Sequence, residues 1–192
     1  MTLSALGIFS AAGAGGAAFS SDYELISTTL IASNTPSVTF SSLGTYSSTY
    51  KHLQIRATAR SSRADTADQH SIRLNGDTGS NYAWHYMESR TGTSTVGSDG
   101  AGSQTDIFGS WLPAASATSN AFGAFVLDIL DPYSTSKNKT IRMLNGAQTF
   151  NVISLGSGFR NNTESLTSIT IGSRLSSNYV AGSRFSIYGI KG

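Results

Sequence analysis

Apolar and polar residues alternate in short runs along most of this chain. The clearest run is 51–60, in which every second residue is apolar (Leu53, Ile55, Ala57, Ala59). Because successive side chains of a β-strand point to opposite faces of a sheet, this pattern predicts a half-buried antiparallel strand. The polar stretch 60–68 that follows predicts a surface loop.

Similar runs, separated by Gly, Ser, Asn and Asp, predict further strands at 23–31, 37–41, 71–75, 82–87, 106–112, 122–130, 140–144, 150–155, 168–173 and 184–190. The run 121–130 is apolar on both faces, which predicts a central strand covered on both sides. Many short strands with turn residues between them are typical of a sandwich or barrel. Since no internal repeat argues for a propeller, we predict an all-β fold, a two-sheet antiparallel sandwich of jelly-roll type.

The composition indicates a surface that is hydrated through hydroxyl groups rather than through charged groups. Among 192 residues there are 33 Ser, 21 Thr and 20 Gly, while charged residues make up only 12%. The formal net charge is +2, and no run of Lys or Arg forms a basic stripe, so we expect no nucleic-acid partner. The chain has no Cys, which excludes disulfides, thiolate zinc sites and a Cys nucleophile. We expect no cofactor.

Residues 1–21 differ from the rest because they carry no charge and are rich in Gly and Ala. A signal peptide would begin with Lys or Arg, and the glycines weaken both a helix and membrane insertion, so we expect no membrane insertion. A frayed terminus and a cleaved signal stay open as alternatives to a docking arm. We predict an arm at 1–21 that attaches or oligomerises the chain, followed by a sandwich domain at 22–192. Its anchoring side chains would be the large apolar ones: Leu3, Leu6, Ile8, Phe9 and Phe19.

Two glycine-containing segments predict bends. The sequence Asn-Gly-Asp-Thr-Gly-Ser-Asn at 75–81 predicts a turn, since Asn-Gly favours positive φ. A calcium site using Asn75, Asp77 and Asn81 is the alternative, although only one carboxylate is present. Residues 155–158 also predict a bend.

Three aromatic residues at alternate positions would share one face of the strand predicted at 82–87. Such a face suits stacking on sugar rings, whereas packing in a core or between subunits is its commoner use. The candidate glycan-binding set adds arginines from neighbouring polar positions, and comprises Tyr82, Trp84, Tyr86, Arg56, Arg60 and Arg73.

Signals for catalysis are weak. His52, His70 and His85 lie on separate predicted strands without metal-ligand spacing, so we expect no metal site. The chain lacks a Gly-x-Ser-x-Gly elbow and a phosphate-binding loop, and most Asp residues lie in predicted turns. We therefore expect a protein that is not an enzyme.

Several segments, taken in order along nearly the whole chain, resemble a family of tailed-bacteriophage virion proteins, the small fibre-like or decoration subunits. The most specific are Asn-Gly-Asp-Thr-Gly-Ser-Asn-Tyr at 75–82 and Phe-Ser-Ile-Tyr-Gly-Ile at 185–190; the others are 23–26, 50–56, 114–123, 131–140 and 182–191. The resemblance implies a β-sandwich displayed on a virion, usually as a homotrimer. It brings no catalytic residues.

Two functions follow as hypotheses. The first is a non-enzymatic virion component that binds itself and other virion proteins (portal, capsid, neck or tail) through 1–21, with host-surface glycan as a further partner. The second is a free carbohydrate-binding or hydrolytic β-sandwich protein.

Overall fold

The computed structural model describes residues 21–90 and 96–192. Within them lie twelve β-strands and two short 3₁₀ turns. The strands are β1 Tyr23–Leu30, β2 Ser37–Phe40, β3 His52–Ala59, β4 Ala67–Leu74, β5 Tyr82–Ser89, β6 Gly97–Gln104, β7 Ile107–Pro113, β8 Gly123–Leu130, β9 Lys139–Ala147, β10 Val152–Arg160, β11 Ile169–Ser173 and β12 Arg184–Ile190, with turns η1 Leu43–Tyr46 and η2 Thr149–Asn151.

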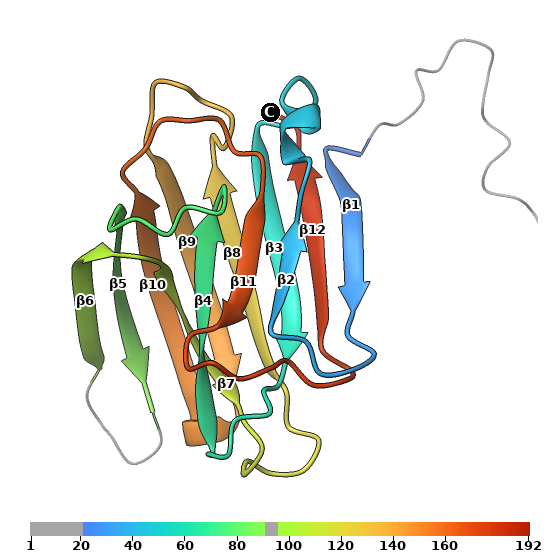
Figure 1. Ribbon diagram of the computed structural model, residues 1–192, viewed down its shortest axis with the longest axis vertical. Coiled ribbons are helices and arrows are strands. Elements are labelled where there is room, and N and C mark those ends of the chain that lie inside the picture. Colours follow the sequence, from blue (N-terminus) through green and yellow to red (C-terminus); the bar gives the residue numbers. More distant parts are fainter. Residues whose placement is uncertain (1–20, 91–95) are drawn as a thin grey trace, which may run out of the picture.

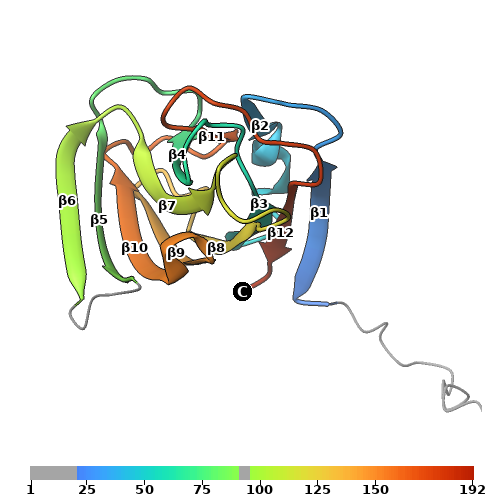
Figure 2. The same ribbon diagram turned by 90° about the horizontal axis from the view of Figure 1, so that it is seen from below.

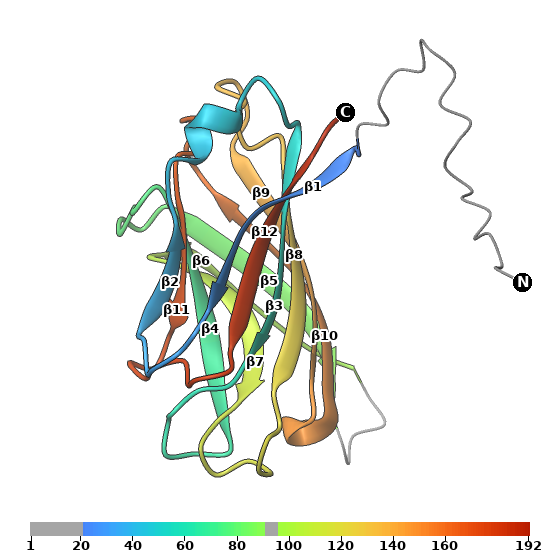
Figure 3. The same ribbon diagram turned by 90° about the vertical axis from the view of Figure 1, so that its right-hand side faces the viewer.

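The strands form two antiparallel sheets packed face to face (Figures 1 and 3). The large sheet has eight strands in the order β1-β12-β3-β8-β9-β10-β5-β6, and the small sheet has four in the order β2-β11-β4-β7. The predicted all-β sandwich is therefore confirmed. We call the face of the large sheet that points away from the small sheet its outer face.

The pairing shows why this sandwich is a jelly roll. Four nested pairs join the beginning of the chain to its end: β1 with β12, β2 with β11, β3 with β8 and β4 with β7. These four pairs alternate between the large and the small sheet, as in a long hairpin rolled into two layers. The remaining strands are two inserted hairpins, β5–β6 and β9–β10, which extend the large sheet beyond β8.

Apolar side chains from both sheets fill the interior. Ile55, Leu127 and Ile187 of the large sheet and Ile72 and Ile171 of the small sheet are buried in one continuous core. They occupy alternate positions of their strands, so the period-two pattern of the sequence identifies them directly. The four-stranded sheet is narrower than its partner, and the large sheet curves around it (Figure 2).

Each of the eleven predicted strands overlaps an observed one, and the structure corrects three details. The strand β6, of sequence Gly-Ser-Asp-Gly-Ala-Gly-Ser-Gln, was not predicted because it contains no β-branched or aromatic residue. The strand β4 begins at Ala67, inside the predicted loop. The bend predicted at 155–158 is wrong, since these residues lie within β10.

A histidine lies in the centre of the sandwich. His70 of β4 is buried, and its Nδ1 is 3.0 Å from the hydroxyl of Tyr179. Its ring also contacts that of Phe125 edge-on. Burial lowers the pKa of His70 to about 4, although the nearby Asp68 carboxylate acts in the opposite direction. The ring is therefore neutral at physiological pH.

Candidate interaction surface

Strand β10 carries large apolar side chains on the outer face, although Val152 at its beginning is buried in the interior. Ser154 and Gly158 point into the sandwich, whereas Ile153, Leu155 and Phe159 point away from it. The interior positions 154 and 158 are small because β7 lies close: Ser110 hydrogen-bonds Ser154, and a Cβ on Gly158 would overlap Ile107. The large apolar residues therefore lie on the side that faces solvent in the single chain.

Neighbouring strands extend this apolar surface in register. Val126 of β8 lies opposite Leu144 of β9, which lies opposite Leu155 of β10, which lies opposite Met87 of β5. Directly opposite side chains in a sheet touch one another. Of these four residues, which we call the apolar row, three are large and well exposed: Leu144 at 52%, Leu155 at 48% and Met87 at 49%.

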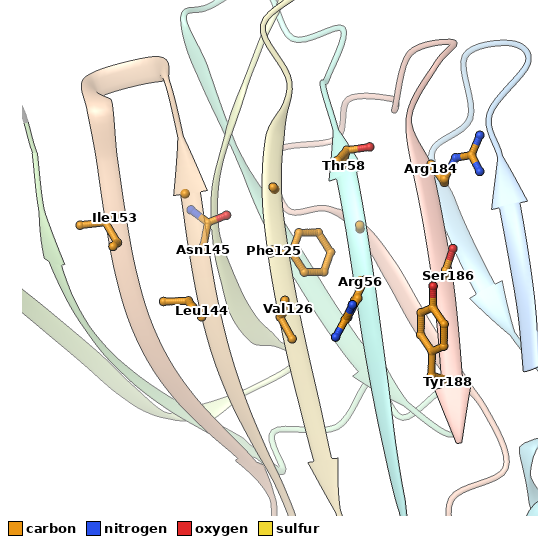
Figure 4. A pocket seen from close by; sticks show the side chains of 13 residues that line it. Arg56, Thr58, Phe125, Val126, Leu144, Asn145, Ile153, Arg184, Ser186 and Tyr188 are labelled. Atoms are coloured by element: carbon orange, nitrogen blue, oxygen red, sulfur yellow. The ribbon is translucent and has the colours of Figure 1, made fainter. Parts of the chain in front are cut away.

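Beside the apolar row lies a depression of about 610 Å³, which we call the hollow (Figure 4). Its floor consists of the small residues Thr58, Ala124 and Gly146, which are adjacent on β3, β8 and β9. On either side of this floor, the same row of paired residues continues to Arg184 on β12 and to Ile153 on β10. A Cβ on Gly146 would meet nothing within 4 Å, so this part of the backbone is open to an approaching group.

Polar contacts border the surface on its other side. Asp128 accepts hydrogen bonds from Gln54 (2.7 Å) and from Arg142 (2.8 Å), and the Arg142 guanidinium neutralises its charge. Tyr23 stacks on Tyr188 with ring centroids 4.7 Å apart. These side chains already have partners within the chain. They therefore lie at the border of the apolar surface with their polar groups paired.

Arg56 is the member of the predicted glycan set that lies on this surface. Its guanidinium is 5.2 Å from the centre of the Tyr23 ring and 5.7 Å from that of Tyr188, and it donates to Gln54. With Arg184 it makes the β3–β12 side of the hollow positively charged, while the β9–β10 side is apolar (Figure 4).

The structure places Tyr82 in the interior rather than on a binding surface. It is 1% exposed, and its hydroxyl lies 3.0 Å from the amide nitrogen and 3.1 Å from the carbonyl oxygen of Leu74. Burial raises the pKa of its phenol. Tyr82 therefore holds the turn after β4 and is unavailable to a sugar ring.

Trp84 and Tyr86 share the face of β5 that points toward β7, as the alternation predicted. Both are half-buried, and Phe108 packs against them with ring centroids 5.3 Å and 4.8 Å away, while Arg174 lies over Trp84 and Phe108. Packing is thus the main role of this stripe within the chain, and only the exposed parts of the two rings remain for stacking.

The other two arginines have structural partners elsewhere. Arg60 donates hydrogen bonds to the carbonyl oxygens of Ala115, Ala117, Thr118 and Ala121, which fixes the loop before β8. Arg73 lies on the small sheet, where it donates to the carbonyl of Thr105. The six glycan candidates therefore do not form one surface.

The segment 75–81 is a turn, in which Asn75 and Gly76 have φ of 55° and 66°. Its carboxylate, Asp77, bonds Arg160 at 2.7 Å, which lowers the pKa of Asp77. Among residues 21–90 and 96–192, no group of three or more His, Cys, Asp or Glu is placed to hold a metal ion. Within the same residues, no helix is long and apolar enough to cross a membrane.

Residues Leu3, Leu6, Ile8, Phe9 and Phe19, predicted to anchor the chain, lie outside the described residues. The described chain enters the sandwich at β1, an edge strand of the large sheet.

Comparison with known proteins gives no significant match: no family model fits the chain, and neither a curated protein nor a solved structure is significantly similar to it. The resemblance to virion proteins stays a prediction, and function has to be inferred from the surface itself.

The alternation of residues alone did not identify the outer face as a functional surface. The available signal was the occurrence of adjacent apolar residues, such as Met143 with Leu144 and Val152 with Ile153, inside predicted strands. Two neighbouring apolar residues in a strand point to opposite faces, so each such pair indicates that both faces are to be covered.

Proposed function

We propose that this chain is a non-enzymatic structural subunit of a tailed-phage virion, a fibre, spike or decoration protein. In this proposal residues 1–21 anchor it to another virion protein, in the portal, capsid, neck or tail. The jelly roll is displayed outward as a homotrimer, where it aids adsorption to the host surface.

The observation that carries the proposal is the exposed apolar outer side of β10. Exposing Ile153 and Leu155 to water while placing Ser154 inside is unfavourable for an isolated domain, because each large aliphatic side chain gains about 1.5–3 kcal/mol from burial. Contiguous apolar surface of this kind marks a contact with another molecule. A subunit that works inside an assembly has such a contact permanently.

Three further features support the same function. Jelly rolls recur in viral coats. A surface rich in Ser and Thr and poor in charge suits a protein that is packed among copies of itself. The uncharged segment 1–21 suits attachment through an apolar groove.

The proposal is tested in particles of the phage that encodes the chain. Mass spectrometry of purified virions is expected to detect the full chain, and a variant lacking 1–21 is expected to fold but to be missing from particles. Circular dichroism of the shortened protein controls for folding. Virions that lack the full chain, or that incorporate the folded shortened chain normally, would contradict the proposal.

A second candidate function, free carbohydrate binding, is favoured by the partial exposure of Trp84 and Tyr86, because jelly rolls also occur in lectins. It predicts a monomer with a saturable sugar site. Loss of glycan-array binding in Trp84→Ala, in a protein absent from virions, would favour this candidate over the first.

A further inference from the structure

We infer that the hollow binds a single molecule of an amphipathic anion, which has an aliphatic body and a carboxylate or phosphate at one end. The anionic end binds Arg56 and Arg184, and the aliphatic body lies on Val126, Leu144 and Ile153. This inference goes beyond the proposed function and does not depend on it.

The hollow has the size and the shape of a small-molecule site. Its volume of about 610 Å³ lies within the roughly 300–1,000 Å³ of ligand pockets, which are mostly apolar with a few polar groups. One row of paired residues crosses it over five neighbouring strands, from Arg184 on β12 to Ile153 on β10. Because neighbouring strands lie about 4.8 Å apart, these two ends are roughly 19 Å apart across the sheet. The ligand that fits is therefore elongated and lies across the strands.

Arg56 is held in position at one end of the hollow. Its guanidinium lies over the rings of Tyr23 and Tyr188, and its Nε donates to the side-chain oxygen of Gln54 at 2.9 Å. In the part of the chain that the structure describes, its two terminal nitrogens have no hydrogen-bond partner. These nitrogens are thus preorganised to donate to an anion, since the side chain loses little freedom when it binds.

Arg184 supplies a second cation next to the first. Arg184 lies opposite Thr58, and Arg56 lies opposite Ser186, so the two arginines are diagonal neighbours on β12 and β3. Diagonal positions in an antiparallel pair are about 7–8 Å apart, a distance that long side chains bridge. Arg184 is exposed and, among residues 21–90 and 96–192, makes no hydrogen bond or ion pair. One carboxylate or phosphate can therefore receive charge-assisted hydrogen bonds from both guanidiniums.

The positive charge at this end has no counterpart within the hollow. Among the described residues, those that line the hollow include no carboxylate. Asp128, on the same face of β8, lies outside the hollow and is paired with Arg142 at 2.8 Å. An anionic ligand is therefore attracted to the arginines and meets no carboxylate in the hollow.

The opposite end of the hollow is aliphatic (Figure 4). Leu144 is 52% exposed and Ile153 is 59% exposed, and Val126 lies opposite Leu144. An aliphatic chain that covers these side chains removes apolar surface from water, which is favourable. A simple anion would leave this end uncovered, and a neutral chain would leave the arginines unpaired. The two ends together select a ligand that carries both groups.

Titration calorimetry of the full-length chain tests the ligand class with four probes that share one chain length, each below its micelle concentration. Decanoate and decyl phosphate carry the anion, decanol is neutral and decyltrimethylammonium is a cation. At least one of the two anions is expected to saturate at one site per chain. Decanol is expected to bind at least tenfold more weakly, and the cation is expected not to bind.

Two pairs of variants test the site. Gly146→Leu fills the hollow at a place where a Cβ meets nothing within 4 Å, and should abolish binding of the anions; Gly102→Leu, on β6 and equally open, is the matched control. Arg184→Gln should weaken anion binding at least tenfold and leave decanol unchanged, whereas Arg142→Gln, on the same face but outside the hollow, should change neither. Circular dichroism controls for the fold of all four.

The inference would be overturned if neither anion saturated, if decanol bound as tightly as the anions, or if the folded Gly146→Leu variant bound them normally. Sedimentation of the chain with phosphatidylglycerol vesicles, without binding of either monomeric anion, would assign the face to a membrane surface and would also overturn it. None of these outcomes depends on incorporation into virions, which tests the proposed function separately.

Discussion

His70 makes the stability of the sandwich sensitive to mild acid. The pKa of His70 is about 4 in the folded protein, whereas the ordinary value is 6.5. Between these pH values, the unfolded chain is protonated at this residue while the folded chain is not. Above pH 6.5, protonation of His70 has no effect on the free energy of unfolding. As the pH falls from 6.5 toward 4, the free energy of unfolding decreases, because only the unfolded chain takes up the proton. Below the folded pKa the cost is constant.

The shift gives the size of the loss. Relative to neutral pH, the free energy of unfolding is expected to fall by about 1 kcal/mol at pH 6, about 2 kcal/mol at pH 5 and about 3 kcal/mol at pH 4 from this residue. Carboxylates with lowered pKa, such as Asp77 and Glu24, lose their own contribution at lower pH as they become protonated.

Urea unfolding at each pH, followed by tryptophan fluorescence, measures the effect in wild type and in His70→Asn. Asparagine can keep the hydrogen bond to Tyr179 but takes up no proton, so the difference between the two proteins isolates His70. His85→Asn, at an exposed position, is the matched control and should keep the full loss. If His70→Asn loses stability between pH 7 and pH 4 as steeply as the wild type, the assignment is wrong.

Three further predictions concern one close packing contact and two sets of hydrogen bonds. Gly158→Ala is expected to destabilise the fold by about 1–3 kcal/mol, because the added methyl would overlap the buried Ile107; denaturant titration measures it, and an unchanged midpoint would contradict the close approach. Tyr82→Phe should cost about 1–3 kcal/mol in the same assay, since it leaves buried backbone groups without their partner, and a neutral effect would mean that water replaces the hydroxyl. Arg60→Met should make the loop 114–121 the first site of limited proteolysis, and cleavage elsewhere first would show that the arginine does not hold it.

Strands with clear alternation could be located from the sequence because their environments differ on the two faces. In β3, Leu53 and Ile55 face the core while Arg56 faces solvent, and the period-two pattern shows this directly. The beginning of β4 was hidden because its buried positions include Asp68 and His70, polar residues whose partners come from distant parts of the chain.

The pairing of strands and the candidate surface required the structure. Val126, Leu144, Leu155 and Met87 come from four strands, and only their register makes them neighbours. The prediction that 122–130 is covered on both sides is met on one side only in the single chain, where Val126 is half-buried and Ala124 is exposed. The uncovered side carries the exposed apolar surface, which in the proposed function contacts another molecule of the assembly.

Accessibility of Leu144 in the assembled protein tests the central claim most directly. Because the chain has no Cys, Leu144→Cys introduces a unique thiol, and Leu175→Cys provides a reference of similar exposure in the single chain. If another molecule covers the outer face, maleimide should label Cys at 144 at least tenfold more slowly than Cys at 175 in the native assembly, and equally fast after unfolding. Equal labelling rates in the native protein would contradict the account.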